Sequence, residues 1–375
     1  MSISTPSIPE RKRILFLVPA FAGGVGGAER VITTLLRHLD PSRFECHLGV
    51  VGTGNSFLEG VPGSVMVHHL GAARMRYAMP GIVKLARRLK PQTILSTVVY
   101  LNVVLIMAKP FFSGRPRILL REAVLPSAYI AQVLRPTRLW KWLYSHLYPR
   151  ADQIICLFDG MVNDMVEHLG IPRGKLVRIY NPVDIEMVRR QAEGTESPYT
   201  GPGPNLVAMG RLQHQKAYDV LLHAFAGVRK SVPGARLTIL GEGPLEQQLK
   251  EQAVSLGLDN AVSFLGFQAN PWPYVKHADL FVLASRYEGL PNAVLEVLAL
   301  GTPVVATDCP GGIREIQKSA PQIALVPPDN PGALTEAIVS ILSRPKETCG
   351  KQTEAEECLR RFDTQQIVDE YARLL

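Results

Sequence analysis

Short apolar runs alternate with amphipathic stretches along the whole chain. The first run, Arg13 to Pro19, is continuously apolar at its centre, as is typical of a strand buried on both faces of a parallel sheet. A glycine-rich turn follows from Gly23 to Gly27, and from about Ala28 to Leu39 the apolar positions recur with helical spacing. A strand, a glycine turn and a helix in this order predict the start of a doubly wound α/β sheet.

The same alternation continues through both halves. In the first half, further strands are expected at Glu45–Val51, Thr93–Val99, Arg117–Leu120, Gln153–Leu157 and Lys175–Ile179. In the second half, strands are expected at Leu206–Met209, Arg236–Leu240, Val262–Leu265, Leu280–Ala284 and Pro303–Ala306. Helices are expected there at Tyr218–Lys230, Leu245–Leu256, Pro291–Leu300 and Pro331–Leu342. This pattern predicts two Rossmann-like, doubly wound domains that face each other across a cleft.

A polar segment rich in Pro and Gly interrupts this alternation at residues 185–204, and we interpret it as a linker. The Asn181–Pro182 pair marks the turn that leads into it. We therefore predict an N-terminal domain over residues 1–184 and a C-terminal domain over residues 205–360. Residues 361–375 are expected to form a helix that returns towards the N-terminal domain.

Charge is distributed unevenly between the halves. Residues 1–190 hold 25 Lys and Arg against 12 Asp and Glu, a net charge of +13, whereas residues 191–375 have a net charge of −5. The basic half could contact phosphates of anionic lipids or of a pyrophosphate-linked acceptor, and the alternative is a basic surface that meets only solvent. We expect no nucleic-acid partner.

The five cysteines are widely spaced and form no Cys-x-x-Cys pair, so neither a disulfide framework nor a zinc site is expected. The chain contains no Asp-x-Asp motif, and we expect no divalent metal and no cofactor. Its apolar stretch from Val98 to Met107 is about half of the roughly 20 residues that a spanning helix needs. We expect it to be buried in the first domain of a cytoplasmic protein.

The segment from Val133 to Arg150 is basic and aromatic, and its position is left open. Trp140, Trp142 and Tyr144 could lie at a bilayer interface, with the neighbouring Arg and Lys side chains on lipid phosphates. Alternatively, the aromatic side chains pack in the core of the first domain. In the first case the protein would lie on the inner face of the cytoplasmic membrane.

The strongest candidate chemistry lies between Ser285 and Glu315. Glu288 is expected in the loop before a helix, and Glu296 about a turn and a half inside that helix. Pro291 is placed where a first helical turn begins. Backbone N–H groups at this helix N-terminus would point at an anion above it. Leu290, Asn292 and Ala293 would supply these N–H groups, and Gly289 and Pro291 belong to the same candidate donor-binding segment.

A second candidate group follows the first strand of the C-terminal half. Gly210 and Arg211 are expected at the carboxyl end of that strand, where open α/β sheets bind ligands, and Lys216 follows shortly after. An Arg and a Lys near one helix N-terminus are suited to holding a pyrophosphate. Such a pair stabilises a departing nucleoside diphosphate more than the ground state, because negative charge develops on it.

Two glycine-rich turns give weaker signals. Gly241, Glu242 and Gly243 follow a strand and open a helix, so a ligand could approach the backbone there. Gly26 and Gly27 end the glycine turn of the first half, which could serve either tight packing or ligand approach. A dinucleotide fingerprint is not met at that turn, because its third glycine would fall on Glu29.

The motifs together resemble the retaining glycosyltransferase family 4, which has the GT-B fold. The resemblance rests on the Glu288/Glu296 pair, on Gly210 to Leu212 with Lys216, on GEGP at Gly241 to Pro244 and on GGAERV at Gly26 to Val31. It covers nearly the whole chain. In particular, the sequence is similar to bacterial members that extend polyprenyl-pyrophosphate-linked or surface glycans with N-acetylhexosamines or related sugars.

The resemblance implies a role for each matching residue. Glu288 would contact donor-sugar hydroxyls, Arg211 and Lys216 would hold the diphosphate of a donor, commonly UDP-linked, and Glu296 would bind ribose hydroxyls. The donor would thus lie in the C-terminal domain and the acceptor in the N-terminal domain. Many relatives carry a histidine after the strand near Leu120, where this chain has Arg121.

Two other functions remain as alternatives from the sequence. A nucleotide-sugar epimerase or dehydrogenase would need a dinucleotide fingerprint and a Tyr-x-x-x-Lys pair, and neither occurs in a suitable context. A non-catalytic partner in glycan assembly would retain the fold without turnover, and the intact donor motifs count against it.

Overall fold

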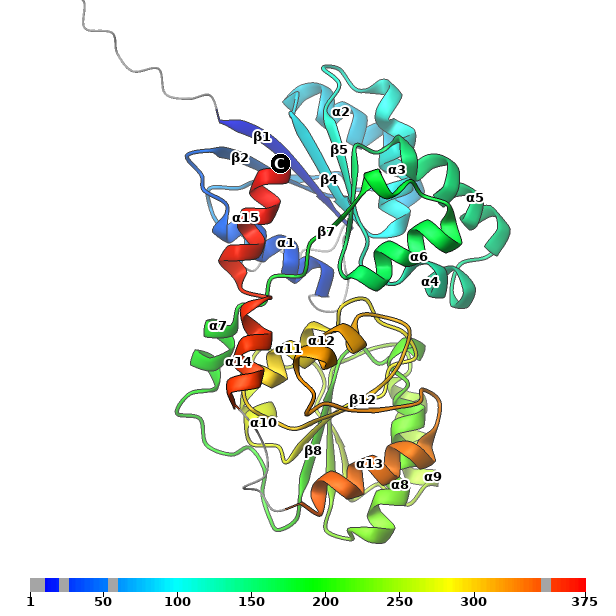
Figure 1. The fold of residues 1–375 in the computed structure, drawn as a ribbon, viewed down its shortest axis with the longest axis vertical. Helices are drawn as coiled ribbons and strands as arrows, with labels where there is room; N and C mark the ends of the chain where they lie inside the picture. Colours follow the sequence, from blue (N-terminus) through cyan, green and yellow to red (C-terminus); the bar gives the residue numbers. More distant parts are fainter. Residues whose placement is uncertain (1–10, 20–26, 53–59, 345–351) are drawn as a thin grey trace, which may run out of the picture.

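The computed structural model describes residues 11–19, 27–52, 60–344 and 352–375, which form two α/β domains stacked one above the other (Figure 1). The N-terminal domain is built on a seven-stranded sheet of order β3-β2-β1-β4-β5-β6-β7, and every adjacent pair of strands in it is parallel. Its strands are β1 (Lys12–Val18), β2 (Phe44–Val50), β3 (Met66–His69), β4 (Thr93–Thr97), β5 (Arg117–Arg121), β6 (Gln153–Cys156) and β7 (Leu176–Arg178). The α-helices of this part are α1 (Gly27–His38), α2 (Met79–Leu89), α3 (Val99–Ala108), α4 (Pro126–Gln132), α5 (Thr137–Leu147) and α6 (Asp159–Leu169).

The C-terminal domain repeats the design with a six-stranded sheet of order β10-β9-β8-β11-β12-β13. Its strands are β8 (Asn205–Met209), β9 (Arg236–Leu240), β10 (Val262–Phe264), β11 (Leu280–Leu283), β12 (Val304–Thr307) and β13 (Ala324–Val326). The helices that surround it are α8 (Tyr218–Ser231), α9 (Glu246–Ser255), α10 (Trp272–Lys276), α11 (Asn292–Ala299), α12 (Ile313–Ser319) and α13 (Pro331–Leu342). The prediction of two doubly wound sheets is confirmed.

Burial explains why the central strands were visible in the sequence. Residues 14–18 of β1 have no exposed surface, as expected for a strand covered by helices on both faces. The edge strands β3 and β13 were not predicted. They contain only four and three residues, MVHH and ALV, which are too short for an apolar pattern to emerge.

The apolar stretch from Val98 to Met107 forms most of α3, whose side chains are almost all buried in the N-terminal domain. A helix that is apolar on every side is typical of burial within a core. Over the ranges that the structure describes, no helix is both long and apolar enough to cross a bilayer.

The chain crosses between the domains twice. After β7, residues 179–184 lead into α7 (Ile185–Ala192), which occupies the start of the predicted linker and packs against α10 and α11. Near the end, α14 (Gln352–Arg360) packs against α11 and α12, and α15 (Thr364–Leu374) lies along α1 (Figure 1). The two crossings touch, because Val183 N donates to Phe362 O at 3.2 Å.

Candidate active site

A cleft of about 400 Å³ separates the two domains at the carboxyl ends of both sheets. One wall comes from the first turn of α1 and the end of β5. The other wall comes from the loops after β8 and β9 and from the N-terminal end of α11. Ligands of open α/β sheets bind at this end of the strands. The cleft is therefore the candidate active site.

The loop after β8 and the loop before α11 meet through an ion pair. Lys216 Nζ donates to Glu288 Oε1 at 2.6 Å, and Ser285 Oγ donates to the same oxygen at 2.6 Å. Glu288 is buried and Lys216 is 19% exposed, so the pair lies on the cleft wall with little solvent around it. A cation and an anion are thus fixed side by side at the predicted position.

The N-terminal end of α11 opens towards this pair. None of the described side chains caps that end, and Gly289, Leu290, Pro291, Asn292 and Ala293 all line the cleft. The glycine is required by the opposing domain, because a Cβ on Gly289 would lie 2.1 Å from Ala123 O. The N–H of Leu125 also donates to Glu288 O at 3.3 Å. The domains therefore touch beside the N-terminal end of α11.

Glu296 lies further inside α11 and pairs across the cleft with Arg30 of α1. The distance from Arg30 Nη1 to Glu296 Oε1 is 3.0 Å, and the guanidinium group lies over the ring of Trp272, 5.8 Å from its centroid. Burial raises the pKa of Glu296, while Arg30 acts in the opposite direction. The residue predicted to bind ribose therefore holds a side chain of the other domain in this structure.

A second polar bridge crosses the cleft from the end of β5. Arg121 is 1% exposed; its Nη1 donates to Thr97 Oγ1 at 3.1 Å and its Nη2 to Asn181 Oδ1. Asn181 Nδ2 in turn donates to Asn292 Oδ1 at 2.8 Å. Arg121 thus orients the Asn181 amide against Asn292 at the start of α11.

Two buried glutamates of the N-terminal domain have a pKa raised to about 7 by burial. Glu29 lines the cleft, and its Oε1 has no hydrogen-bond partner among the described residues. Glu122 accepts hydrogen bonds from Asn102, Tyr144 and Tyr148, and it is not part of the cleft lining. Of these two, Glu29 is the one that combines a place in the cleft lining with a carboxyl oxygen that has no partner among the described residues.

The remaining predicted positions divide into two groups. Gly210, Arg211, Gly241, Glu242 and Gly27 line the cleft. Gly243 does not line it, because its α-carbon faces the backbone of Leu212, whose O would lie 2.4 Å from a Cβ. Gly243 therefore serves packing of the loops in this structure. Gly26 lies outside the described residues.

Several cleft residues were not predicted. They are Glu29, Arg30, Arg121, Asn181, Gln213, Gln215, Phe267 and Gln268. A signal existed for the first two, since both belong to the GGAERV segment, in which only the glycines were singled out. Within the described ranges, no group of three or more His, Cys, Asp and Glu side chains is arranged to hold a metal ion.

Comparisons with known proteins agree with this geometry. The sequence profile described as "Glycosyltransferase Family 4" matches residues 25–187, and the profile "Glycosyl transferases group 1" matches residues 203–344. A Campylobacter jejuni protein is 28% identical over 94% of this chain and 96% of its own length. It is named N-acetylgalactosamine-N,N'-diacetylbacillosaminyl-diphospho-undecaprenol 4-alpha-N-acetylgalactosaminyltransferase. The lipopolysaccharide core biosynthesis glycosyltransferase LpsE of Rhizobium meliloti is 27% identical over 77% of this chain and 78% of its own.

Solved structures share the two-domain architecture. Anabaena Alr3699/HepE in complex with UDP and glucose superposes with a TM-score of 0.77 at 20% identity, over 97% of this chain and 99% of that one. Sucrose-phosphate synthase from Thermosynechococcus elongatus superposes with a TM-score of 0.82 at 18% identity, over 97% and 98% of the two chains. The profiles, relatives and fold agree: the chain belongs to glycosyltransferase family 4, and it is a GT-B glycosyltransferase that transfers a sugar from a nucleotide sugar.

Proposed function

We propose that this enzyme transfers an N-acetylhexosamine or a hexose, with retention of anomeric configuration, from a UDP-linked donor to a polyprenyl-pyrophosphate-linked or surface glycan. The observation that carries the donor half of this proposal is the Lys216–Glu288 pair beside Arg211 and the open end of α11. Family membership favours a transferase over an epimerase, a dehydrogenase or a non-catalytic partner.

In the proposed complex the diphosphate lies between Arg211, Lys216 and the N-terminal end of α11. The bond from the sugar's anomeric carbon to the diphosphate breaks, and a bond from the acceptor oxygen forms on the same face. The acceptor's proton passes to a leaving phosphate oxygen, so the enzyme supplies no separate nucleophile. Two cations and a helix N-terminus stabilise the charge that develops on the leaving group.

The donor sugar and the nucleoside are assigned to neighbouring positions. Glu288 would accept hydrogen bonds from sugar hydroxyls, since Lys216 and Ser285 already fix its orientation. Glu296 would bind the ribose once its ion pair with Arg30 is broken. UDP as the nucleotide is supported by Alr3699/HepE, a structural neighbour with UDP bound. The name of the Campylobacter jejuni relative supports a lipid-linked acceptor.

A membrane-facing side for that acceptor is provided by α5. Leu139 and Trp142 are 48% and 51% exposed, and Arg138 and Lys141 on the same helix are also exposed. The opposite side of the segment is core, since Tyr144 is buried and stacks on Tyr148 with a centroid distance of 4.2 Å. The core alternative for Val133 to Arg150 therefore holds for its buried side, and the bilayer alternative stays a prediction for its exposed side.

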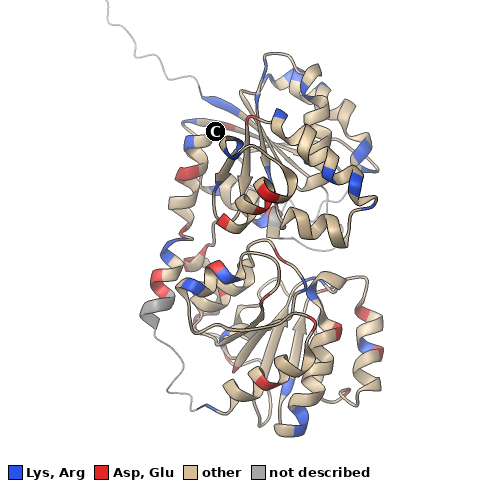
Figure 2. Cartoon of the chain, turned by 45° about the vertical axis from the view of Figure 1, so that its right-hand side comes forward, with Lys and Arg blue, Asp and Glu red and all other residues tan. Residues whose placement is uncertain are grey.

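We assign this exposed face of α5 to an anionic membrane. Apolar side chains among Lys and Arg are suited to the headgroup region, and Figure 2 shows Lys and Arg on several helices of this domain. Sedimentation with vesicles of phosphatidylglycerol, compared with vesicles of phosphatidylcholine, tests the assignment. We expect binding to the anionic vesicles only and its loss in L139S/W142S; equal pelleting of that variant would contradict it.

The donor assignment is tested by thermal-shift screening with UDP- and GDP-sugars, because a ligand that binds only the folded state raises the melting temperature. The donor that stabilises most is then used in a transfer assay with a polyprenyl-pyrophosphate-linked glycan. We expect UDP-sugars to stabilise and Glu288→Ala to abolish transfer. Wild-type turnover by Glu288→Ala, or stabilisation by GDP-sugars alone, would contradict the proposal.

A further inference from the structure

The first turn of α1 places a buried carboxyl group on the cleft wall. Glu29 is 1% exposed, it lines the cleft, and none of the described residues hydrogen-bonds to its Oε1. The next residue, Arg30, pairs with Glu296 of the C-terminal domain and so holds this turn against the cleft. A buried carboxyl oxygen without a partner is unfavourable for folding, which points to a role with a ligand.

The charges around Glu29 are mainly positive. The cleft walls near it carry Arg121 from the end of β5 and Arg211 from the loop after β8, and both guanidinium groups favour its ionised form. Other titratable or charged groups on these walls and on α15 are Arg30, Lys216, Glu242, Glu288, Glu296 and Tyr371. Four of these are already engaged in the Arg30–Glu296 and Lys216–Glu288 pairs. Glu29 thus shares its cations with any anion in the cleft.

We propose that Glu29 is a positioning residue that couples binding of the donor's diphosphate to the uptake of one proton. In the ligand-free cleft, its carboxylate would balance the charge of Arg211 and Arg121. When the diphosphate binds Arg211, the carboxylate would lose that share of its compensation and would be a buried charge beside two further negative charges. Protonation removes that charge. This inference rests on the donor site of the proposed function.

The pKa of Glu29 in the ligand-free protein determines the direction and size of the pH effect on donor affinity. Burial raises the pKa of Glu29 to about 7, against the lowering effects of its own backbone N–H and of the two guanidinium groups. A bound diphosphate raises that pKa further, because like charges disfavour ionisation. Donor affinity should therefore fall by about tenfold from pH 6 to pH 8. At pH 6 most of these carboxyl groups are already protonated, so few protons are taken up.

Isothermal titration calorimetry on the full chain measures this coupling directly. UDP-glucose is a suitable probe, because its doubly substituted diphosphate keeps the same charge from pH 6 to pH 8. Titrations at pH 8 in two buffers of different ionisation enthalpy give the number of protons bound. We expect about one proton taken up per bound UDP-glucose at pH 8 and much less at pH 6. Uptake of no proton at pH 8 overturns the inference.

Two matched variants assign the proton to its residue. Glu29→Gln should bind UDP-glucose with no proton uptake and with an affinity that no longer changes between pH 6 and pH 8. Glu122→Gln is the control, because Glu122 has a similarly raised pKa but lies outside the cleft lining. The control should retain the proton uptake of the wild type. Uptake that persists in Glu29→Gln overturns the inference.

Failure of this inference and failure of the proposed function give different results. Binding of UDP-glucose without proton uptake contradicts the role of Glu29 alone. Absence of binding for UDP-glucose and for UDP contradicts the proposed donor and this inference with it. Proton uptake by the wild type tests the inference even if a variant does not fold.

Discussion

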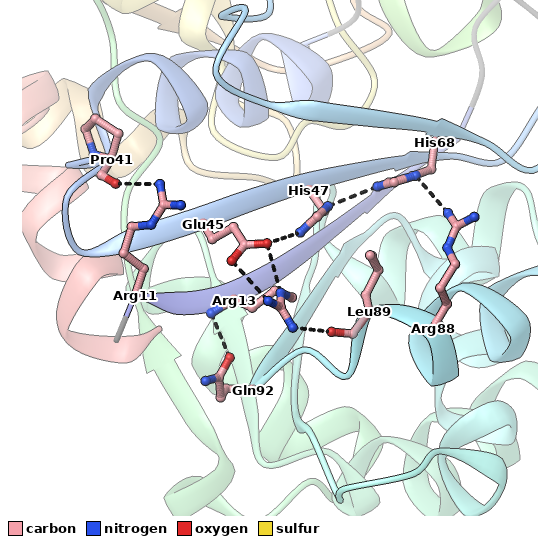
Figure 3. Close-up of polar contacts among 9 residues, drawn as sticks. All are labelled: Arg11, Arg13, Pro41, Glu45, His47, His68, Arg88, Leu89 and Gln92. Carbon is pink, nitrogen blue, oxygen red and sulfur yellow. Dashed lines mark hydrogen bonds and ion pairs between the residues drawn. The ribbon is translucent and has the colours of Figure 1, made fainter. Parts of the chain in front are cut away.

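The two ends of the N-terminal sheet arrange their charged and polar groups in different ways. Towards the amino ends of β1 and β2, Arg13, Glu45 and His47 bond to one another, and His47 also bonds to His68 of β3, which accepts from Arg88 of α2 (Figure 3). At the carboxyl ends, Glu29 Oε1 and Arg121 Nε have no hydrogen-bond partner within the described part of the chain. The first arrangement satisfies its own groups, whereas the second leaves two buried polar atoms unsatisfied.

The direction of the hydrogen bonds at the amino ends is fixed by one residue. Arg88 can only donate, so His68 Nδ1 accepts from it at 3.1 Å. His68 Nε2–H then donates to His47 Nδ1 at 3.0 Å, and His47 Nε2–H donates to Glu45 Oε1 at 3.0 Å. Both imidazoles are therefore neutral in this chain of bonds. We therefore predict that variants at the carboxyl ends lower activity, whereas variants at the amino ends lower stability.

The largest effect is expected at the carboxyl ends, from Lys216→Ala. Loss of a cation that contacts the leaving diphosphate should lower kcat/KM by about 100- to 1000-fold. Lys250→Ala is the matched control, because Lys250 pairs with Glu246 at the same distance of 2.6 Å but on the exposed surface of α9. Steady-state kinetics with a UDP-sugar measure both. Similar activity in the two variants would contradict the assignment of Lys216.

A smaller effect on a different property is expected from Glu45→Gln at the amino ends. Arg13 and His47 lose their anionic acceptor, which should lower the free energy of unfolding by about 2 kcal/mol while kcat stays unchanged. The hydrogen bond from Arg13 lowers the pKa of Glu45 from 4.5 to about 2. The wild type should therefore lose this contribution as the pH falls from about 4.5 to 2. Urea unfolding at pH 7 measures the change in the free energy of unfolding. A drop in kcat would contradict the expectation that this end of the sheet affects stability alone.

At the carboxyl ends, Glu29→Gln should raise the stability of the protein, whereas Glu45→Gln at the amino ends should lower it. The pKa of Glu29 is higher in the folded state than in the unfolded state, so ionisation disfavours folding as the pH rises from 4.5 to about 7. Removing the ionisable group should stabilise the protein by about 1 kcal/mol at pH 8 and by less at pH 5. Urea unfolding at both values measures this. A variant less stable than the wild type at pH 8 would show that Glu29 has a structural partner.

The smallest effect is expected from His68→Gln, since a glutamine side chain can also accept from Arg88 and donate to His47. Burial, His47 and Arg88 lower the pKa of His68 below 6.5. The folded state therefore binds this proton less readily, and the wild type should lose a little stability as the pH falls from 7.5 to 5.5. The variant should lose less. Melting temperatures at the two pH values test this, and an identical decrease would place the proton elsewhere.

The sequence was sufficient to place the cleft residues of the C-terminal domain because its signals are local. Glu288, Pro291 and Glu296 belong to one loop and helix, and Arg211 directly follows one strand. The spacing along a single element predicts where each side chain lies relative to its neighbours. These positions all line the cleft.

The cleft residues of the N-terminal domain could be predicted less completely. Arg30 meets Glu296 across 266 residues, and no local pattern shows that contact. Arg121 looked like a departure from the family at a strand end, but its link to Asn292 through Asn181 appears only when the domains are placed together. Interdomain contacts depend on the relative position of the two domains, which periodicity does not encode.

The double crossing between the domains restricts how the cleft can open. Residues 179–184 and 360–363 run next to each other, and the bond from Val183 N to Phe362 O ties them together. Beyond them, the hydroxyl of Thr93 donates to Leu375 O, which anchors the tail to the N-terminal domain. Two adjacent connections permit bending about the line that joins the points where they cross between the domains. They oppose translation of one domain past the other and twisting of one domain against the other. The enzyme should therefore admit its substrates by a single bending motion whose axis lies at one edge of the molecule, with the widest excursion on the side of α4 and α5.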